Sequence, residues 1–376
     1  MIQDILTYFD AMIDTEASDL YLTAGSRPTM RVDDALQTIG ETSLAEKDIQ
    51  NIISSLLSLR QVREFEMNKE LNTAVDAGEK GRYRINVMQQ RQKPALVIRR
   101  IVTKIPDFEA LRLPAISEKL ALMKQGLVLF TGMTGSGKST SLASILDYRN
   151  THRAGHIITI EDPIEFFHEH KQSVITQREV GVDTESYEAA LKNVLRQRPD
   201  VIMIGEIRSR EVMEQALTAA ETGHLCFATL HTNNTYQAID RIVNFFPEEL
   251  QSQICLNLSL NLRAIVSQRL IPSLQGGLAL ASEVLLNEGY IKTLIHEGKI
   301  KEILGVMSKN SVQGMQTFDG SLLELYREGV ISEESALTFA DIPGDLKVKL
   351  KESGMKSTDE GSGLGAIDTT LLSISE

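Results

Sequence analysis

The stretch GLVLFTGMTGSGKSTSLASIL, from Gly126 to Leu146, constrains the fold of this chain more than any other. A short apolar run leads into a glycine-rich turn, Gly132 to Ser139, that matches the phosphate-binding pattern G-x-x-x-x-G-K-[ST] in full. Glycines there let backbone N–H groups surround phosphate oxygens, and the helical pattern that follows adds its positive N-terminal end. A chance match in a chain of this length has a probability of roughly one per cent. We therefore predict a strand–loop–helix unit that binds a nucleotide.

The residues of this loop have distinct expected roles. Lys138 would reach the β- and γ-phosphates and the Ser139 hydroxyl would ligate Mg²⁺, so ATP and Mg²⁺ are the expected cofactors. The alternative is a plain glycine turn between a strand and a helix. The residues predicted to hold the nucleotide are Gly132, Thr134, Gly135, Ser136, Gly137, Lys138, Ser139 and Thr140.

Composition narrows the possible classes of function. The chain of 376 residues is long enough for two domains with a substantial core. Its net charge of −12 and lack of Trp argue against a nucleic-acid surface with stacking aromatics. Cys226 and Cys255 form no C-x-x-C pair, which excludes a zinc knuckle. No apolar run approaches the roughly 18 residues that span a bilayer, so we expect no direct membrane insertion.

Hydrophobic periodicity predicts an α+β domain at the N-terminus, residues 1–102. A hairpin is expected over 28–40 and a helix over 44–69. Residues 82–90 and 95–101 are expected to form paired strands.

The remainder of the chain alternates strand and helix patterns after a proline-containing linker, 103–120. Residues 121–345 predict an α/β domain with C-terminal helices that carries the phosphate loop, because alternation of this kind is typical of a mostly parallel sheet. Helical patterns are assigned to 248–270 and 290–340, and a disordered tail to 346–376. The strands expected in the sheet are 127–131, 156–160, 201–204 and 225–230.

Two of these strands would deliver carboxylates to the sheet edge where ligands bind in open α/β folds. HIITIEDPIEF ends its strand at Glu161, which could deprotonate the attacking water as a general base. RPDVIMIGE ends at Glu206, which could hold Mg²⁺ through water. The two roles could also be reversed. A solvated acidic turn at Glu161 and a plain buried strand before Glu206 are the structural alternatives.

One histidine and three arginines complete the candidate site. His231 closes the strand in TGHLCFATLHTNN and could sense the γ-phosphate, although a lone edge histidine is more often structural. Arg82 and Arg84 are two apart on RYRINV and share a face, and Arg99 lies on the next strand. These guanidinium groups could neutralise the ATP charge of a neighbouring subunit, or they could form a solvated strand face.

The order of four segments carries a family resemblance. The phosphate loop, TIEDPIEF, RPDVIMIGEIR and TAAETGHLCFATLHTN resemble the secretion ATPase superfamily of type II secretion and type IV pili, over about residues 15–340. The glycine before Glu206, where a usual Walker B motif has Asp, is a trait of that superfamily. The resemblance implies a RecA-like P-loop ATPase core with a smaller N-terminal α+β, PAS-like domain. The catalytic residues that it implies are Glu161, Glu206, His231, Arg82, Arg84 and Arg99, with Ser139 and Glu206 on the metal side.

Within the superfamily the chain resembles the retraction branch, the PilT/PilU family of type IV pilus ATPases. ASDLYLTAG, RYRINV and VIRRI match segments of that branch, and the four-cysteine knuckle of many extension and secretion motors is missing. The main retraction motor carries Ala-Ile-Arg-Asn-Leu-Ile-Arg-Glu late in its chain, whereas this sequence reads GYIKTLIHE, with Lys292 and His296 at the arginine positions. That departure, together with the polar C-terminal stretch, resembles the paralogous ATPase that assists the main motor.

The resemblance implies an ATP-hydrolysing hexameric motor, or motor accessory, that powers type IV pilus retraction and twitching motility. Its implied partners are further copies in a homohexamer, the paralogous motor PilT and the inner-membrane pilus platform protein, with no nucleic acid. The implied location is the cytoplasm, peripheral at the inner membrane. The alternatives left open are a type II secretion or pilus extension ATPase, a nucleic-acid translocase, and a scaffold that binds ATP without catalysis.

Overall fold

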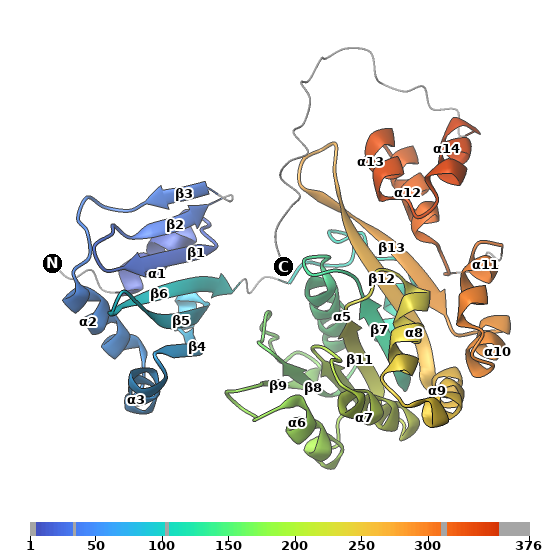
Figure 1. The fold of residues 1–376 in the computed structure, drawn as a ribbon, viewed down its shortest axis with the longest axis horizontal. Helices are drawn as coiled ribbons and strands as arrows, with labels where there is room; N and C mark the ends of the chain where they lie inside the picture. The colour runs from blue at the N-terminus through green and yellow to red at the C-terminus, as the bar shows by residue number, and fades with distance from the viewer. Residues whose placement is uncertain (1–4, 33–34, 102–104, 310–313, 353–376) are drawn as a thin grey trace.

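The computed structural model describes residues 5–32, 35–101, 105–309 and 314–352, which form two sheets with helices around each. The first sheet is antiparallel, with strand order β3-β2-β1-β6-β5-β4. Figure 1 shows this part in blue at one side of the molecule. Its elements are α1 (Ile5–Asp14), β1 (Asp19–Thr23), β2 (Thr29–Val32), β3 (Ala35–Thr38), α2 (Glu46–Leu56), α3 (Leu59–Asn68), β4 (Glu70–Asp76), a 3₁₀ turn (Gly78–Lys80), β5 (Arg82–Gln90) and β6 (Lys93–Ile101).

Alternating side chains give the first sheet one apolar face. In β5, Tyr83 and Ile85 are fully buried, whereas Arg82 and Arg84 belong to the opposite face. Tyr83 stacks on Phe9 of α1 with ring centroids 3.7 Å apart, so α1 covers the apolar face. The two arginines are thereby left on the face that α1 does not cover.

Most predictions for this part are confirmed, with one correction. The hairpin and the paired strands are present, while residues 33–34 of the hairpin lie outside the described residues. The single helix over 44–69 is wrong, because the chain is extended at Leu57 and a second helix begins after Ser58. Ser58 Oγ accepts a hydrogen bond from the backbone N–H of Gln61, which is the usual start of a new helix.

The second sheet has seven strands in the order β13-β12-β7-β11-β10-β8-β9. All neighbours are parallel except the antiparallel hairpin of β12 and β13. Its elements are α4 (Ile116–Ala121), β7 (Gly126–Thr131), α5 (Lys138–His152), β8 (Gly155–Glu161), β9 (Ser173–Glu179), α6 (Tyr187–Val194), a 3₁₀ turn (Leu195–Gln197), β10 (Val201–Ile204), α7 (Arg210–Glu221), β11 (Leu225–Leu230), α8 (Thr235–Asn244), α9 (Glu248–Asn261), β12 (Leu262–Pro272) and β13 (Leu278–Leu286).

The two faces of this sheet bury separate apolar clusters. α5 packs Leu142 and Ile145 against Val128 and Phe130 on one face. α7, α8 and α9 cover the other face. Because both faces are buried, β7 and β10 are continuous apolar runs, which explains why their positions were predictable. The carboxyl ends of β7, β8, β10 and β11 meet at one edge of the sheet, where the phosphate loop begins.

Two features of the second sheet differ from the sequence prediction. The helix assigned to 248–270 ends at Asn261, and the next residues form β12. β12 is a strand because it pairs with β7 on one side and β13 on the other, which outweighs its helical spacing. β9 and β13 were not predicted.

The last three of the C-terminal helices pack on the far end of the β12–β13 hairpin, shown in red in Figure 1, whereas the first two lie beside α9. The C-terminal elements are α10 (Tyr290–His296), a 3₁₀ turn (Ile300–Glu302), α11 (Ile303–Met307), α12 (Phe318–Arg327), α13 (Glu333–Phe339) and α14 (Pro343–Glu352). Assigning a disordered tail from residue 346 is wrong for α14, in which Leu346 and Leu350 are buried. Residues 353–376 lie outside the described residues. None of the described helices is long and apolar enough to cross a membrane.

The predicted linker, 103–120, is in part attached to the second sheet. Its helix α4 buries Leu120 in the same cluster as α5. Phe108 stacks on Tyr148 of α5 with ring centroids 4.7 Å apart. Arg112 forms an ion pair of 2.7 Å with Glu328, just beyond α12. The part of the linker from Phe108 onward therefore contacts the ATPase domain.

Candidate active site

The phosphate loop begins with Gly132, and any other residue at this position would displace neighbouring atoms. Gly132 has φ +145°, and a Cβ there would lie 2.3 Å from Ser136 Oγ and 2.6 Å from the Gln268 carbonyl oxygen. Gly137 has φ +86° and caps α5, so the chain turns directly from the loop into the helix. Both backbone conformations favour glycine, which explains two invariable positions of the motif.

Lys138 begins α5, and its side chain points back into the phosphate loop. Its Nζ donates hydrogen bonds of 2.8 Å to the carbonyl oxygens of Gly132 and Met133. Burial lowers the pKa of Lys138, and the carboxylates of Glu206 and Glu165 oppose that shift. The ammonium group is thus held at the position where the motif needs a cation for phosphate.

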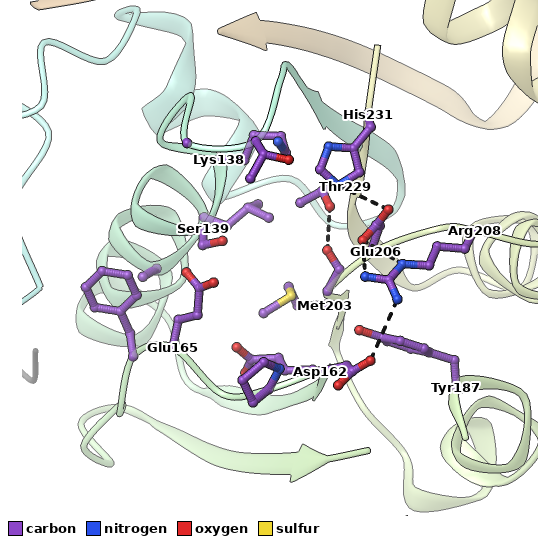
Figure 2. A pocket seen from close by; sticks show the side chains of 18 of the residues that line it. Lys138, Ser139, Asp162, Glu165, Tyr187, Met203, Glu206, Arg208, Thr229 and His231 are labelled. Atoms are coloured by element: carbon purple, nitrogen blue, oxygen red, sulfur yellow. Dashed lines mark hydrogen bonds and ion pairs between the residues drawn. The ribbon is translucent and has the colours of Figure 1, made fainter. Parts of the chain in front are cut away.

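A cavity of about 310 Å³ lies beside the loop, and half of the predicted site residues line it. Figure 2 shows Lys138 and Ser139 on one side of this cavity and Glu206 and His231 on another. Gly132, Ser136, Gly137 and Thr140 belong to the loop and the first turn of α5 without lining this cavity. The predicted residues that line it are Thr134, Gly135, Lys138, Ser139, Glu161, Glu206 and His231.

Glu161 ends β8 and is almost completely buried, with 8% of its surface exposed. Its Oε1 accepts a hydrogen bond of 2.6 Å from Thr159 Oγ1 and a longer one of 3.3 Å from Gln177. Burial raises the pKa of Glu161 to about 7, and these hydrogen bonds offset only part of the increase. A carboxylate that titrates near neutral pH is suited to accept a proton during turnover.

Glu206 follows β10 and has the opposite electrostatic character. Arg208 donates to Glu206 Oε2 at 2.8 Å, and His231 Nε2 lies 3.1 Å from Oε1 (Figure 2). Burial alone would raise the pKa of Glu206, but the hydrogen bonds and charges of Arg208 and His231 together lower it. Glu206 is therefore ionised at neutral pH, as a carboxylate near a cation must be.

Several cavity residues were not identified from the sequence. Arg208 lies 3.8 Å from Asp162 as well as against Glu206, so one guanidinium joins the ends of two strands. Glu165 and Tyr187 also line the cavity, from the loop after β8 and from the start of α6. Only Arg208 had a sequence signal, namely a cation two residues after an acidic strand end.

The three arginines of the first sheet do not share one environment. The Arg82 guanidinium lies 4.3 Å from the centre of the Phe167 ring and 3.9 Å from Glu179, both in the second part of the chain. Arg84 lies in the field of Glu179 and other carboxylates of that region, and burial lowers its pKa. Arg99 instead pairs with Asp19 of its own sheet at 2.7 Å. None of the three lines the cavity.

A second cavity, of about 480 Å³, lies on the other side of the phosphate loop. It shares Thr134 and Gly135 with the first cavity and is bounded by Arg269 of β12 and Phe339 of α13. Arg269 is fixed there by Asp341 at 2.7 Å. The phosphate loop thus lies between two cavities, which together could hold a ligand with a charged part at one end and an uncharged part at the other.

Known proteins resemble this chain over most of its length. A family model described as "Type II/IV secretion system protein" matches residues 1–289. The type IV pilus ATPase PilU of Pseudomonas aeruginosa is 48% identical over 94% of this chain and 93% of its own length. The retraction ATPase PilT of the same organism is 40% identical over 87% of this chain and 95% of its own. A crystal structure of the pilus retraction motor PilT with bound ADP has a TM-score of 0.87 and 41% identity, covering 92% of this chain and 99% of that one.

These similarities confirm the family and the RecA-like fold that the sequence motifs predicted. The family model covers more than half of the chain, and both relatives align over nearly their full length. The match to the PilT structure includes both sheets, because it covers almost the whole described chain. This chain therefore belongs to the type II/IV secretion system protein family and, within it, to the PilT/PilU type IV pilus ATPases.

Proposed function

We propose that this protein is an ATP-hydrolysing motor, or an accessory subunit of one, that powers type IV pilus retraction and twitching motility. The observation that carries the proposal is the cavity in which a phosphate loop meets two carboxylates with opposite pKa shifts. Similarity to the retraction ATPase PilT over most of the chain supports retraction rather than another use of ATP hydrolysis.

The two cavities suggest how the nucleotide lies. The triphosphate would follow the phosphate loop into the cavity that holds Lys138, and the nucleoside would extend toward Arg269 and Phe339. Ser136 Oγ is buried and has no hydrogen-bond partner among the described residues, so a phosphate oxygen would satisfy it. The oxygen donors of Ser139 and Glu206 fit Mg²⁺, which would neutralise phosphate charge when bound.

The pKa shifts support different roles for the two carboxylates. Glu161, with a pKa of about 7, is proposed as the general base that takes a proton from the attacking water. Glu206 stays ionised and is proposed as the carboxylate on the metal side. His231, held against Glu206, would contact the γ-phosphate, and Lys138 would stabilise charge that develops on it.

The first sheet is proposed to complete the site by movement. Arg82 already contacts Phe167 and Glu179 beside the cavity, so a small approach would bring Arg82 and Arg84 toward the phosphates. Arg99 would take part only if its ion pair with Asp19 opened. Closure of this kind, of its own or a neighbouring core, would convert hydrolysis into motion around a homohexameric ring.

We propose that the ring acts from the cytoplasm, peripheral at the inner membrane, on the pilus platform protein and together with the paralogous motor PilT. An accessory role is favoured by Lys292 and His296 on α10, where the main retraction motor has arginines. Neither residue lines the nucleotide cavity, so this departure leaves the hydrolytic residues unchanged.

The test combines turnover of the purified protein with pilus retraction in cells. ATP turnover should fall by orders of magnitude in Lys138→Ala and in Glu206→Ala, with an unchanged circular dichroism spectrum. Labelled pili would then be followed in cells that are intact, lack the gene, or carry Glu206→Ala. Loss of retraction in both altered strains supports a motor, and survival only with Glu206→Ala supports an accessory that acts by binding. Near-normal turnover in both variants would refute the proposed site.

A further inference from the structure

Three buried polar side chains form a row across β7, β12 and β13, beside the phosphate loop. Thr131 of β7 is opposite Ser267 of β12, and Ser267 is opposite Glu283 of β13. Residues in register point to the same face with Cβ atoms about 5 Å apart. All three are completely buried. Among the described residues, Thr131 Oγ1, Ser267 Oγ and Glu283 Oε2 have no hydrogen-bond partner.

The other carboxylate oxygen of Glu283 holds the start of α8. Glu283 Oε1 accepts hydrogen bonds from the backbone N–H of Thr235 at 2.8 Å and from Thr235 Oγ1 at 2.7 Å. Thr235 is the first residue of α8 and follows His231 by four positions. From the same helix, Arg241 donates to the His231 carbonyl oxygen at 2.8 Å. The position of α8 therefore determines where His231 lies against Glu206.

The row is consistent with a neutral Glu283. Burial raises the pKa of Glu283, the hydrogen bonds from Thr235 oppose the shift, and the charges of Asp341 and Arg269 act in opposite directions. A protonated Oε2 would donate to Ser267, whose hydroxyl could pass a hydrogen bond on to Thr131. These hydrogen bonds would satisfy three buried polar groups that would otherwise destabilise the folded protein. Thr131 immediately precedes Gly132, so the row ends where the phosphate loop begins.

We propose that Glu283 is a positioning residue for ATP hydrolysis. Through Thr235 and α8, Glu283 holds His231 against Glu206. Through Ser267 and Thr131, it connects the segment between β11 and α8, which contains His231, to the start of the phosphate loop. The proposal rests on the catalytic role proposed above for His231. Glu283 itself lines neither of the two nucleotide cavities.

The test is steady-state ATP turnover by the full chain with Glu283→Leu and Glu283→Gln. Glu283→Leu removes both hydrogen bonds to Thr235 and should lower kcat about tenfold with KM for ATP within about twofold, since the nucleotide contacts remain. Glu283→Gln resembles the protonated acid and should keep kcat within about twofold. Leu285→Ala is the matched control, on the same strand and face but in apolar contacts only. It should lower the melting temperature and leave kcat at 25 °C within about twofold.

A double-mutant comparison separates positioning from a general structural effect. If Glu283 acts through His231, adding Glu283→Leu to His231→Ala should lower kcat by less than about twofold further. If Glu283→Leu fails to fold, Thr235→Val, which removes one of the two hydrogen bonds, should lower kcat about threefold and show the same non-additivity. Full additivity, equal losses in Glu283→Gln and Glu283→Leu, or an unchanged kcat in Glu283→Leu would each overturn the proposal. An unchanged kcat in His231→Ala would overturn both the role of His231 and the proposal for Glu283. A lower kcat in His231→Ala with an unchanged kcat in Glu283→Leu would overturn only the role of Glu283.

Discussion

Replacing Glu161 by Gln should stabilise the protein at alkaline pH while it abolishes hydrolysis. The pKa of Glu161 is about 7 in the folded protein against an ordinary value of 4.5. Between these two values the folded state binds more protons than the unfolded state, so stability falls as the pH rises. The raised pKa of Glu161 therefore lowers the free energy of unfolding by about 3 kcal/mol at pH 8 and by about 1 kcal/mol at pH 5. Gln carries no charge at either pH.

The difference between the two pH values isolates the charge. Gln keeps an oxygen that accepts from Thr159 Oγ1, and any cost of its amide nitrogen is the same at pH 5 and pH 8. The advantage of Glu161→Gln over the wild type should therefore grow by about 2 kcal/mol, or about 4 to 8 °C in melting temperature, between pH 5 and pH 8. Differential scanning calorimetry at the two pH values measures this, and turnover of the same variant should fall by about 10² to 10⁴.

Glu206→Gln supplies a control with the opposite sign. The pKa of Glu206 is lowered, so its charged form stabilises the fold at every pH above its ordinary value and this stabilisation is lost only in acid. Glu206→Gln should lower the melting temperature at both pH 5 and pH 8, whereas Glu161→Gln should raise it at pH 8. Parallel curves of melting temperature against pH for Glu161→Gln and the wild type would refute the reasoning for Glu161, because they would mean that its carboxyl titrates normally.

Three further predictions follow from contacts described above. Lys138→Ala should reduce binding of a fluorescent ATP analogue at least tenfold, because it removes the cation inside the phosphate loop; unchanged binding would contradict the placement of Lys138. Arg82→Ala should lower kcat and increase cleavage by chymotrypsin after Phe167, because the guanidinium no longer covers that ring; wild-type digestion would argue against docking of the first sheet. Leu346→Ala should destabilise the fold by about 2 to 5 kcal/mol in urea titration, whereas a tail residue would cost nothing.

The parts of the fold that were predictable are those whose local pattern has one dominant cause. β10 is apolar throughout and β7 is apolar up to Phe130 because helices cover both faces, and the phosphate loop has glycines where positive φ angles require them. β12 was assigned as a helix because its alternation is hidden by burial on both faces, and only its pairing with β7 and β13 makes it a strand. α14 was missed because two buried leucines in a charged stretch are a weak signal.

The candidate site shows the same division. Lys138, Glu161 and Glu206 follow from strand ends and the loop motif, because parallel strands bring their carboxyl ends to one edge. The partners that set their pKa values were not predicted. Arg208 reaches Glu206 through a loop conformation, and Glu161 owes its raised pKa mainly to its depth of burial.

The stacking of Phe108 on Tyr148 limits the length of the segment that connects the first sheet to the second. The first sheet ends at Ile101, and the chain is attached to α5 from Phe108 onward. Seven residue steps, at no more than about 3.6 Å each, span at most about 25 Å. That reach is about the diameter of a small domain, so the first sheet can dock on its own core or on an immediate neighbour and on nothing more distant. A ring built from such chains would transmit force only between adjacent members.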